Sequence, residues 1–494
     1  MIMTSTATIL WFRQDLRLSD NPALLEAVAK GAPIIPLYIY SDHQESWPMG
    51  AAQRWWLHYS LEELAQSLEK MGAKLVLRRG QAQKVLRELI DEVGADAVFW
   101  NRCYEPYAIK RDTAIKEQLK KDGIQVESFN ASLLYEPWEV QNKSGKPFQV
   151  FTFFWKAALA LRDPLPPKTT KAITSPGQFP KSETLASFEL LPTIDWAKTI
   201  QNTWKPGEAG AQERLKDFLK TAVFDYLEGR NRPDFDGVSR LSPYLHFGEI
   251  SPRQCWQAVK EALDEVPPKQ RADAAKNVEV YLRELGWREF GYHLLYHFPE
   301  TTHAPLHKEY QNFPWMPNDR LLKAWQKGRT GFPMVDAGMR QLWATGWMHN
   351  RVRMIVASFL VKDLLINWVD GAEWFWDTLL DADLASNSLG WQWAAGCGAD
   401  AAPYFRVFNP ITQGQKFDPD GQYVRKWVPE LSKLSSKWIH EPWKAPPLEL
   451  QAAGVELGEN YPEPIVDHAQ ARIRALAALK AMKEDKPKAA AKAR

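Results

Sequence analysis

The chain has 494 residues, a net charge of +2, 45% hydrophobic and 25% charged residues. This composition is ordinary for a globular protein with room for two or three domains. The apolar run Met354–Val361 is far short of the roughly 20 residues that a membrane span needs, and the N-terminus lacks the pattern of a secretory signal. We therefore expect a cytoplasmic protein with no membrane partner. The near-neutral charge leaves nucleic-acid binding open, because a local basic patch would be enough.

Three isolated cysteines, Cys103, Cys255 and Cys397, indicate a reducing compartment and no disulfide framework. They are fewer than an iron–sulfur cluster normally needs, and no ligand spacing indicates a metal site. The chain also has 23 tryptophans, ten of them between Trp287 and Trp393. A large helical core accounts for most of these indoles, yet many of them stand beside charged residues.

The first 130 residues alternate apolar runs with amphipathic stretches. We expect strands at 7–13, 33–40, 74–80, 97–102 and 124–130, with helices over 51–72, up to about Val93, and over 107–122. This alternation predicts an α/β domain with a Rossmann-like, doubly wound parallel sheet covered on both faces. Ligands of such sheets bind at the carboxyl ends of the strands. Because no GxGxxG or Walker lysine motif follows a strand, a standard nucleotide site is not expected there.

Residues 131–205 are proline-rich, which indicates an irregular connection wrapped on the surface. From about Pro206 onward, helical patterns replace strand patterns, at 208–228, 252–263, 273–295, 334–345, 348–363 and 371–380. We therefore predict an α/β domain at 1–130, a connector at 131–205, an all-helical domain at 206–445 and a C-terminal extension at 446–494. The basic tail from Arg472 to Arg494 is expected to be solvated and partly disordered.

Two triplets in the helical region share the spacing i, i+3, i+4, which places each triplet on one helical face: Glu284, Trp287, Arg288 and Asn350, Arg353, Met354. An exposed Glu–Arg pair beside a core tryptophan would give the first triplet, and an ordinary amphipathic helix would give the second. A carboxylate beside an indole would also suit a flat aromatic ligand with polar edges. The spacing alone leaves these alternatives open.

The run Ser239–Ser242 precedes a helix-like stretch and supplies hydroxyls, backbone N–H groups and the cation of Arg240. Such a turn can hold a phosphate, although Ser–Pro before a helix is more often only a cap. The run therefore indicates a phosphate site only in combination with other evidence.

The segment DADLASNSLGWQWAAG, residues 381–396, brings acids and indoles together. One of Asp381 and Asp383 can pair with an arginine while the other faces a ligand. Trp391 and Trp393 are two residues apart, so they serve different neighbours in either a helix or a strand. Acid–base catalysis by two carboxylates has little support, because nothing identifies a hydrolysable substrate.

Together these segments resemble the photolyase/cryptochrome family of blue-light flavoproteins. The likeness runs from WFRQDLRLSDN at 11–21 to about Trp443, and its most specific runs are ELGWREF, GFPMVDAGMRQLWATGWMHNRVRMIVASF, DADLASNSLGWQWAAG and DAAPYFRVFNPITQGQKFD. Within the family, SWPMGAAQRWWLHYSLEELAQSLEK, KPGEAGAQERL and ELGENYPEPIVDHAQAR look most like class III bacterial dimer photolyases, with class I as the alternative. The resemblance implies an α/β domain for an optional antenna pigment and a helical domain that binds FAD.

The resemblance also implies a set of FAD contacts at matching positions: Tyr226, Ser239, Arg240, Leu241, Ser242, Arg288, Asn350, Arg353, Asp381, Asp383 and Asn387. Val238 stands where the family often has a hydroxyl residue. Arg353 is expected to pair with Asp381 against the flavin ring. Asn387 matches the residue that faces flavin N5, and an asparagine there cannot act as a proton donor, which suits an enzyme that keeps its reduced flavin anionic.

Three further sets follow from the same matching. The pocket of cyclobutane pyrimidine dimer repair enzymes corresponds to Glu284, Trp287, Asn350, Met354 and Trp393; the Met354 position is not histidine, unlike in (6-4) repair enzymes. The tryptophan chain that relays electrons to oxidised flavin corresponds to Trp391, Trp368 and Trp315. Contacts to DNA are expected from Arg230, Trp287, Arg351 and Gln413.

The antenna expected from the class III likeness is 5,10-methenyltetrahydrofolate, with a deazaflavin or no antenna as alternatives. Its candidate site combines side chains at strand ends with one tryptophan: Tyr40, Asn101, Glu105 and Trp55. The resemblance thus implies a deoxyribodipyrimidine photo-lyase, a monomer that repairs cyclobutane pyrimidine dimers in UV-damaged DNA.

Two other functions compete with repair. The first is a cryptochrome-type photoreceptor without repair activity, against which the full lesion pocket and the lack of a long signalling extension argue. The second is an ordinary Rossmann oxidoreductase, against which the missing glycine fingerprint argues.

Overall fold

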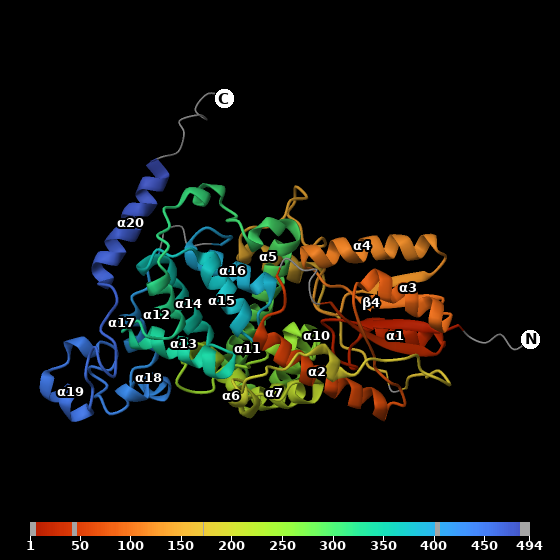
Figure 1. Cartoon of the computed structure of the whole chain (residues 1–494), viewed down its shortest axis with the longest axis horizontal. Coiled ribbons are helices and arrows are strands. Elements are labelled where there is room, and N and C mark those ends of the chain that lie inside the picture. Colours follow the sequence, from red (N-terminus) through yellow and green to blue (C-terminus); the bar gives the residue numbers. More distant parts are fainter. Residues whose placement is uncertain (1–5, 42–46, 171, 401–405, 485–494) are drawn as a thin grey trace, which may run out of the picture.

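The computed structural model describes residues 6–41, 47–170, 172–400 and 406–484. An α/β domain lies at the right of Figure 1 and a larger helical domain at its left, with the N-terminus and C-terminus at opposite ends. The parallel sheet has the order β3-β2-β1-β4-β5, with strands β1 (Thr8–Phe12), β2 (Ile34–Tyr40), β3 (Val76–Arg79), β4 (Ala97–Asn101) and β5 (Gln125–Phe129). The strand order reverses between β1 and β4, which is the switch point where such sheets place ligands.

Helices cover both faces of this sheet, as the alternation of patterns predicted. They are α1 (Pro22–Lys30), α2 (Ala51–Lys70), α3 (Ala82–Val93) and α4 (Pro106–Lys121). The start of α1 follows from local chemistry, because the Asn21 side chain accepts a hydrogen bond from the backbone N–H of Leu24 at 3.1 Å and a proline occupies the first helical position. Both central strands, β1 and β4, are buried along their whole length.

The connector differs from the prediction of an irregular surface segment. It begins with buried residues, among them Ala131, Leu133 and Tyr135, and it contains helix α5 (Phe151–Leu161), the short turn η1 (Leu185–Phe188) and helix α6 (Lys198–Thr203). The periodicity of FTFFWKAALAL predicts α5, since its buried positions recur at i, i+3, i+4 and i+7. The proline-rich flanks obscure this pattern in the sequence.

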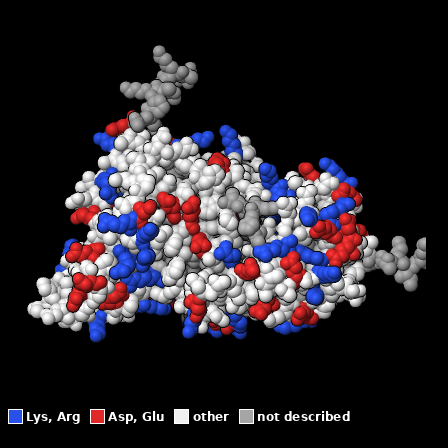
Figure 2. Space-filling view, in the orientation of Figure 1, with Lys and Arg blue, Asp and Glu red and all other residues white. Residues whose placement is uncertain are grey.

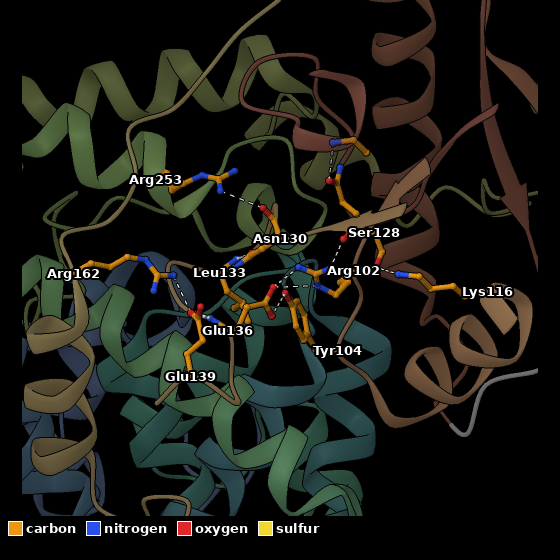
Figure 3. A network of polar contacts seen from close by, with 12 residues as sticks. Arg102, Tyr104, Lys116, Ser128, Asn130, Leu133, Glu136, Glu139, Arg162 and Arg253 are labelled. Atoms are coloured by element: carbon orange, nitrogen blue, oxygen red, sulfur yellow. Dashed lines mark hydrogen bonds and ion pairs between the residues drawn. The ribbon is translucent and has the colours of Figure 1, made fainter. Parts of the chain in front are cut away.

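Polar contacts fasten the first part of the connector to both domains (Figure 3). In the α/β domain, Arg102 and the hydroxyl of Tyr104 donate hydrogen bonds to Glu136, at 2.5 and 2.9 Å. From the helical domain, the Glu289 carboxylate accepts hydrogen bonds from the backbone N–H groups of Leu134 and Tyr135, at 2.9 and 3.1 Å, and Arg253 donates to the carbonyl oxygen of Asn130, just before the connector, at 3.1 Å. This segment is therefore a structural joint between the domains rather than a solvated linker.

The second half of the chain is helical, as predicted. It contains α7 (Glu208–Lys220), η2 (Ala222–Asp225), α8 (Tyr226–Gly229), α9 (Ser242–His246), α10 (Pro252–Asp264), α11 (Pro268–His297), η3 (Pro299–Thr302), η4 (Lys308–Asn312), α12 (Asp319–Gln326), α13 (Pro333–Thr345), α14 (Asn350–Ser358), the π-helical η5 (Phe359–Asp363), α15 (Trp368–Thr378), α16 (Leu384–Ala395), α17 (Pro410–Phe417), α18 (Gln422–Trp427), η6 (Pro429–Leu431), η7 (Pro442–Lys444), α19 (Pro447–Ala453) and α20 (His468–Glu484). Its largest core cluster gathers side chains of α13, α14, α15 and α16.

Helix α20 corrects the prediction for the basic tail. Residues up to Glu484 are helical, and the buried side chains of Ala475, Leu479 and Met482 pack against Phe313 and Leu365. Tail residues 485–494 lie outside the described residues.

Charges of both signs are interspersed over the face shown in Figure 2, and acidic side chains gather at the end that carries the α/β domain. Within the described residues, no helix is long and apolar enough to cross a bilayer. A pattern of this kind favours local rather than global electrostatic attraction of a charged partner.

Candidate functional site

Four helices build the site. The long helix α11 packs against α16, and α14 and α15 pack against α16 from other sides. Both triplets predicted from their spacing lie on helices, the first on α11 and the second in the first turns of α14. The tertiary structure therefore brings residues far apart in sequence to one region around α16.

The pair that the resemblance implied is present at the start of α16. The Arg353 guanidinium donates to both carboxylate oxygens of Asp381, at 3.0 and 2.8 Å, and its Nε donates to the carbonyl oxygen of Met348 at 2.8 Å. The Asp381 side chain is only 3% exposed. One guanidinium nitrogen thus contacts both carboxylate oxygens while Nε is held by the backbone. Charge-assisted bonds of this kind fix the guanidinium beside the carboxylate.

Asp383 has a different role from Asp381. It caps α16 by accepting a hydrogen bond from the backbone N–H of Ser386 at 2.7 Å, and the Tyr292 hydroxyl donates to its other oxygen. Burial by itself favours the neutral acid, but the His246 ring 3.8 Å away, the charge of Arg288 and the Tyr292 hydroxyl hold the pKa of Asp383 below its usual range. Asp383 is thus a buried, ionised anchor. Sequence reasoning missed His246 and Tyr292, although Tyr292 is four residues after Arg288 on the same helix.

Asn387 lies one turn further along α16 and is 9% exposed. Its amide nitrogen donates to the carbonyl oxygen of Ala372 at 3.1 Å. This contact uses one of the two amide N–H groups, so the second N–H and the side-chain carbonyl oxygen remain as a donor and an acceptor. Neither group is acidic at neutral pH.

The acid of the first triplet forms an ion pair. Glu284 Oε1 is 2.7 Å from Nη1 of Arg230, and that guanidinium lies 5.9 Å from the ring centroid of Tyr226. Burial raises the pKa of Glu284, and the charge of Arg230 opposes this rise only in part. The carboxyl group is therefore held near the helix surface in an environment that strengthens any hydrogen bond it makes.

The second triplet opens α14 beside this pair. Asn350 is exposed and Met354 is partly buried. Arg351 donates to Oδ1 of Asn231 at 2.6 Å, approaches the Met354 sulfur at 3.8 Å and lies 4.5 Å from the ring centroid of Phe417. These contacts hold a cation and a soft apolar side chain at the surface.

The predicted phosphate turn has an unusual backbone. Arg240 adopts a left-handed conformation with φ of 51° and pairs with Asp236 at 3.2 Å. Trp347, which sequence reasoning missed, has the guanidinium carbons of Arg240 and Arg353 5.1 and 6.0 Å from its ring centroid, and its indole N–H is 3.4 Å from the Ser242 hydroxyl oxygen. This tryptophan therefore joins the turn to the Arg353–Asp381 pair.

The other residues of this turn and its surroundings divide by exposure. Leu241 and Tyr226 are buried, whereas Ser239 and Arg240 are partly exposed and Ser242 is exposed.

Four further predicted site residues lie on three helices: Trp287 and Arg288 on α11, Trp393 on α16 and Gln413 on α17. The Arg288 guanidinium donates to the carbonyl oxygen of Ser132 at 2.6 Å and lies 4.8 Å from the Tyr292 ring centroid. Trp287, Trp393 and Gln413 are partly exposed. The partial exposure of both tryptophans leaves aromatic surface available to a ligand.

The three tryptophans of the expected relay lie in and against one core cluster. Trp391 and Trp368 are buried within it, and Trp315 packs against it. Gly371 makes room for Trp391, because a Cβ at that glycine would lie only 2.1 Å from the indole ring. Trp368 is one turn before Gly371 on α15, so the two helices place these indoles on neighbouring surfaces.

The four residues predicted to hold an antenna differ in their exposure to solvent and in their contacts. Tyr40 stacks on Phe188 at 5.1 Å and is partly exposed, while Trp55 is 2% exposed inside the core. The side chain of Asn101, also 2% exposed, donates to Asp15 and Asn21 at 2.6 and 2.7 Å. Its hydrogen-bonding capacity is therefore used within the protein.

Glu105 is 4% exposed and directly precedes α4. It accepts a hydrogen bond from the Gln14 side chain at 2.7 Å. Of the four residues, Tyr40 is the one whose side chain is open to solvent.

The donor set around α16 fits a flavin dinucleotide. It offers a fixed guanidinium, a buried carboxylate, an amide acceptor and a cationic turn, which match the polar edges and phosphates of such a ligand. Among the described residues, no group of three or more His, Cys, Asp or Glu side chains could hold a metal ion.

Two family models match this chain: one described as DNA photolyase matches residues 8–171, and one described as the FAD binding domain of DNA photolyase matches residues 281–481. A deoxyribodipyrimidine photo-lyase of Agrobacterium fabrum is 52% identical over 98% of this chain and 100% of its own length. Cryptochrome-1 of Arabidopsis thaliana is 42% identical over 94% of this chain and 69% of its own length.

Among solved structures, a bacterial class III photolyase from Agrobacterium tumefaciens superimposes with a TM-score of 0.93 and 51% identity, covering 98% of this chain and 99% of that one. The fold, the arrangement of α11, α14 and α16, and these similarities agree with one another. This chain belongs to the photolyase/cryptochrome family, and its structure is similar to that of a class III photolyase.

Proposed function

We propose that this protein is a deoxyribodipyrimidine photo-lyase that repairs cyclobutane pyrimidine dimers in UV-damaged DNA by light-driven electron transfer from reduced FAD to a flipped-out dimer. The observation that carries this proposal is the juxtaposition of the Arg353–Asp381 pair with the Glu284–Arg230 pair around α16 and α11. The Agrobacterium photo-lyase, 52% identical over its whole length, supports the same activity.

Bound FAD would supply the photochemistry, and the side chains bind and orient. The flavin shell comprises Tyr226, Ser239, Arg240, Leu241, Ser242, Arg288, Asn350, Arg353, Asp381, Asp383 and Asn387. Arg353, fixed by Asp381, presents a cation to the ring edge, and the Asn387 carbonyl oxygen accepts without supplying a proton. Asp383 remains ionised and orders the start of α16.

The lesion pocket comprises Glu284, Trp287, Asn350, Met354 and Trp393. Glu284 hydrogen-bonds a base of the dimer, and Asn350 assists it. The two indoles and Met354 pack against the lesion, whose poor stacking lowers the cost of flipping it out of the duplex. Arg230, Arg351 and Gln413 contact the flanking strand, so binding is expected to weaken as salt concentration rises.

The photo-lyase proposal is tested by illuminating the reduced protein with a dimer-containing oligonucleotide and following dimer loss. We expect reversal in the light and none in the dark. Glu284→Ala should lower the repair yield while FAD absorbance shows that the cofactor stays bound. Absence of light-dependent reversal by the wild-type protein would remove the proposal.

A blue-light photoreceptor without repair activity is the second candidate, because the Arabidopsis cryptochrome is 42% identical to this chain. The same assay separates the two functions. A photoreceptor would photoreduce its flavin and leave the dimers intact.

We further propose 5,10-methenyltetrahydrofolate as the antenna, with a deazaflavin as the alternative. Tyr40, Trp55, Asn101 and Glu105 were proposed to hold it, and the partly exposed Tyr40 has the best access to a pigment. An absorption spectrum of the purified protein distinguishes folate from deazaflavin. We also propose a cytoplasmic monomer, which light scattering and cell fractionation would check.

A further inference from the structure

Helix α5 lies in the connector, outside both predicted domains, yet it reaches the proposed lesion pocket. Its first residue, Phe151, stacks on Trp287 of α11 with ring centroids 3.8 Å apart and an interplanar angle of 9°. This is close to face-to-face contact between two rings. One face of the Trp287 indole is therefore covered by Phe151, while the residue as a whole remains partly exposed.

Phe151 is itself immobilised. It is 1% exposed, and on α5 the ring of Trp155 lies nearly parallel to it, at 12° and 6.4 Å. Phe290 contacts both Phe151 and Trp287 by edge-to-face packing, at 6.0 and 5.9 Å. Rings held by several neighbours in a close-packed interior have few alternative orientations, so the plane of Phe151 is fixed before any ligand binds.

A glycine in α11 permits the close approach of α5. A Cβ on Gly286 would lie 2.8 Å from ring atoms of Trp155, nearer than real Cβ contacts. Gly286 directly precedes Trp287, so the residue that lets α5 dock and the residue that α5 supports are neighbours on one helix.

The approach to α5 is anchored separately. The backbone N–H of Phe148 donates to Nε2 of His293 at 3.0 Å, and the other ring nitrogen of His293 is 3.1 Å from the carbonyl oxygen of Pro137. Burial, with a smaller contribution from the neighbouring His297, lowers the pKa of His293 to about 4. The imidazole is therefore neutral at physiological pH, with a free lone pair for the Phe148 N–H.

We propose that Phe151 is a positioning residue of the lesion pocket: it fixes the plane of Trp287 so that the opposite indole face packs flat against the pyrimidine dimer. This inference rests on the proposed repair function, and it assigns to the connector a part in lesion recognition. Phe151 acts through Trp287 and is covered by protein, so it does not touch the substrate itself.

The test compares Phe151→Leu with Phe154→Leu. Phe154 is also on α5 and 1% exposed, but its ring contacts are with Phe290 and His293, at 5.2 and 4.9 Å. The two changes remove the same atoms from the same core. The readout is the ratio of Kd values for undamaged and dimer-containing oligonucleotides, measured in the dark with the holoprotein.

We expect Phe151→Leu to lower this ratio about three- to tenfold, the range of one aromatic pair, and Phe154→Leu to leave it unchanged. Phe151→Tyr, which keeps the ring, should retain most of the ratio. If the leucine variant does not fold, the same measurements can be made on Phe151→Met, whose unbranched, flexible side chain fills irregular core gaps. Equal ratios for the Phe151 and Phe154 variants would overturn the inference.

A double-mutant cycle gives a second readout. If Phe151 acts through the indole, Phe151→Leu should have little effect in a Trp287→Ala background, because the coupled partner is gone. An effect of undiminished size in that background would overturn the positioning role. A wild-type protein that neither prefers nor repairs dimers would refute the proposed function itself, whereas a repairing wild type with an unaffected Phe151→Leu variant would refute only this inference.

Discussion

At the carboxyl edge of the sheet, the Asn101 side chain donates to Asp15 and Asn21 and is buried among them. Around α16, by contrast, Arg353 spans two elements to reach Asp381, and Asn387 keeps its carbonyl oxygen for a ligand. Both regions were predicted to bind chromophores. The helical region converges on a site, whereas the strand-end edge uses its polar groups to hold the fold together.

The difference has a geometric cause. Residues at i, i+3 and i+4 share a face on any helix, so the sequence fixes their relative placement once the helix forms. Side chains at strand ends meet only through the register and crossover connections of the whole sheet. A residue can therefore lie at a strand end, as predicted, and still form hydrogen bonds with neighbouring loops instead of binding a ligand.

The largest expected effect concerns the relay. Trp391→Phe should remove most of the photoreduction of oxidised FAD while repair by prereduced enzyme is retained. The smaller ring leaves a cavity in the core, which should cost about 1–2 kcal/mol of stability. Flash photolysis and the dimer assay measure the two activities. Equal loss of both would contradict separate roles for Trp391 and the lesion pocket.

Arg353→Ala should be the most destabilising change at the helical site. It leaves Asp381, with a side chain only 3% exposed, without its ion-pair partner, at a cost of about 3 kcal/mol. Urea unfolding of the FAD-free protein measures this loss, and FAD occupancy is expected to fall as well. The control is Arg162→Ala, which breaks an exposed pair with Glu139 and should cost about 1 kcal/mol or less.

The third prediction concerns His293 of α11, which holds the connector through Phe148 and Pro137. Its pKa is lowered from 6.5 in the unfolded chain to about 4 in the folded protein, so the unfolded state binds more protons between these values. Its contribution to stability is complete above pH 6.5 and is lost, by about 3 kcal/mol, as pH falls through 4. Unfolding free energies of wild type and His293→Gln across this range measure it; a variant with the same pH dependence as wild type would contradict the assignment.

Of the four predicted changes, Asn101→Ala should have the smallest effect. It tests whether the Asn101 side chain stabilises the fold or contacts a pigment. It leaves buried partners of Asn101 unpaired, which we expect to cost about 1–3 kcal/mol, while any antenna absorbance is retained. Thermal unfolding and an absorption spectrum give both quantities. Loss of antenna absorbance at unchanged stability would instead make Asn101 a pigment contact.

Much of the fold follows from local patterns. The strands of the sheet, helices α2, α3 and α4 and the helical character of the second half were predicted from the period of the apolar residues. Several elements were not, among them α1, the short helices α12, α17, α18 and α19, and α16, for which a strand was also left open. Two more are α5, where prolines flank a short helical pattern, and α20, where lysines and arginines surround the apolar side chains that pack against Phe313 and Leu365. In both, a few buried contacts to distant residues outweigh the local composition.

The candidate site divides in the same way. Spacing along the sequence identified both triplets, and the resemblance implied the Arg353–Asp381 pair. It missed Trp347, His246 and Tyr292, because their roles come from contacts with residues on other elements. A buried aromatic or histidine in a helical pattern looks the same in sequence whether it fills a core or supports a ligand contact.

The sequence by itself determined which side chains of the two triplets share a helical face, since that depends on spacing within one element. Only the tertiary structure decided that Asp383 caps α16 and accepts a hydrogen bond from Tyr292. It also decided that the Asn101 side chain donates to Asp15 and Asn21 and that Phe151 of the connector lies against Trp287. These are contacts between segments distant in the chain, and their formation depends on how whole helices and the sheet pack together.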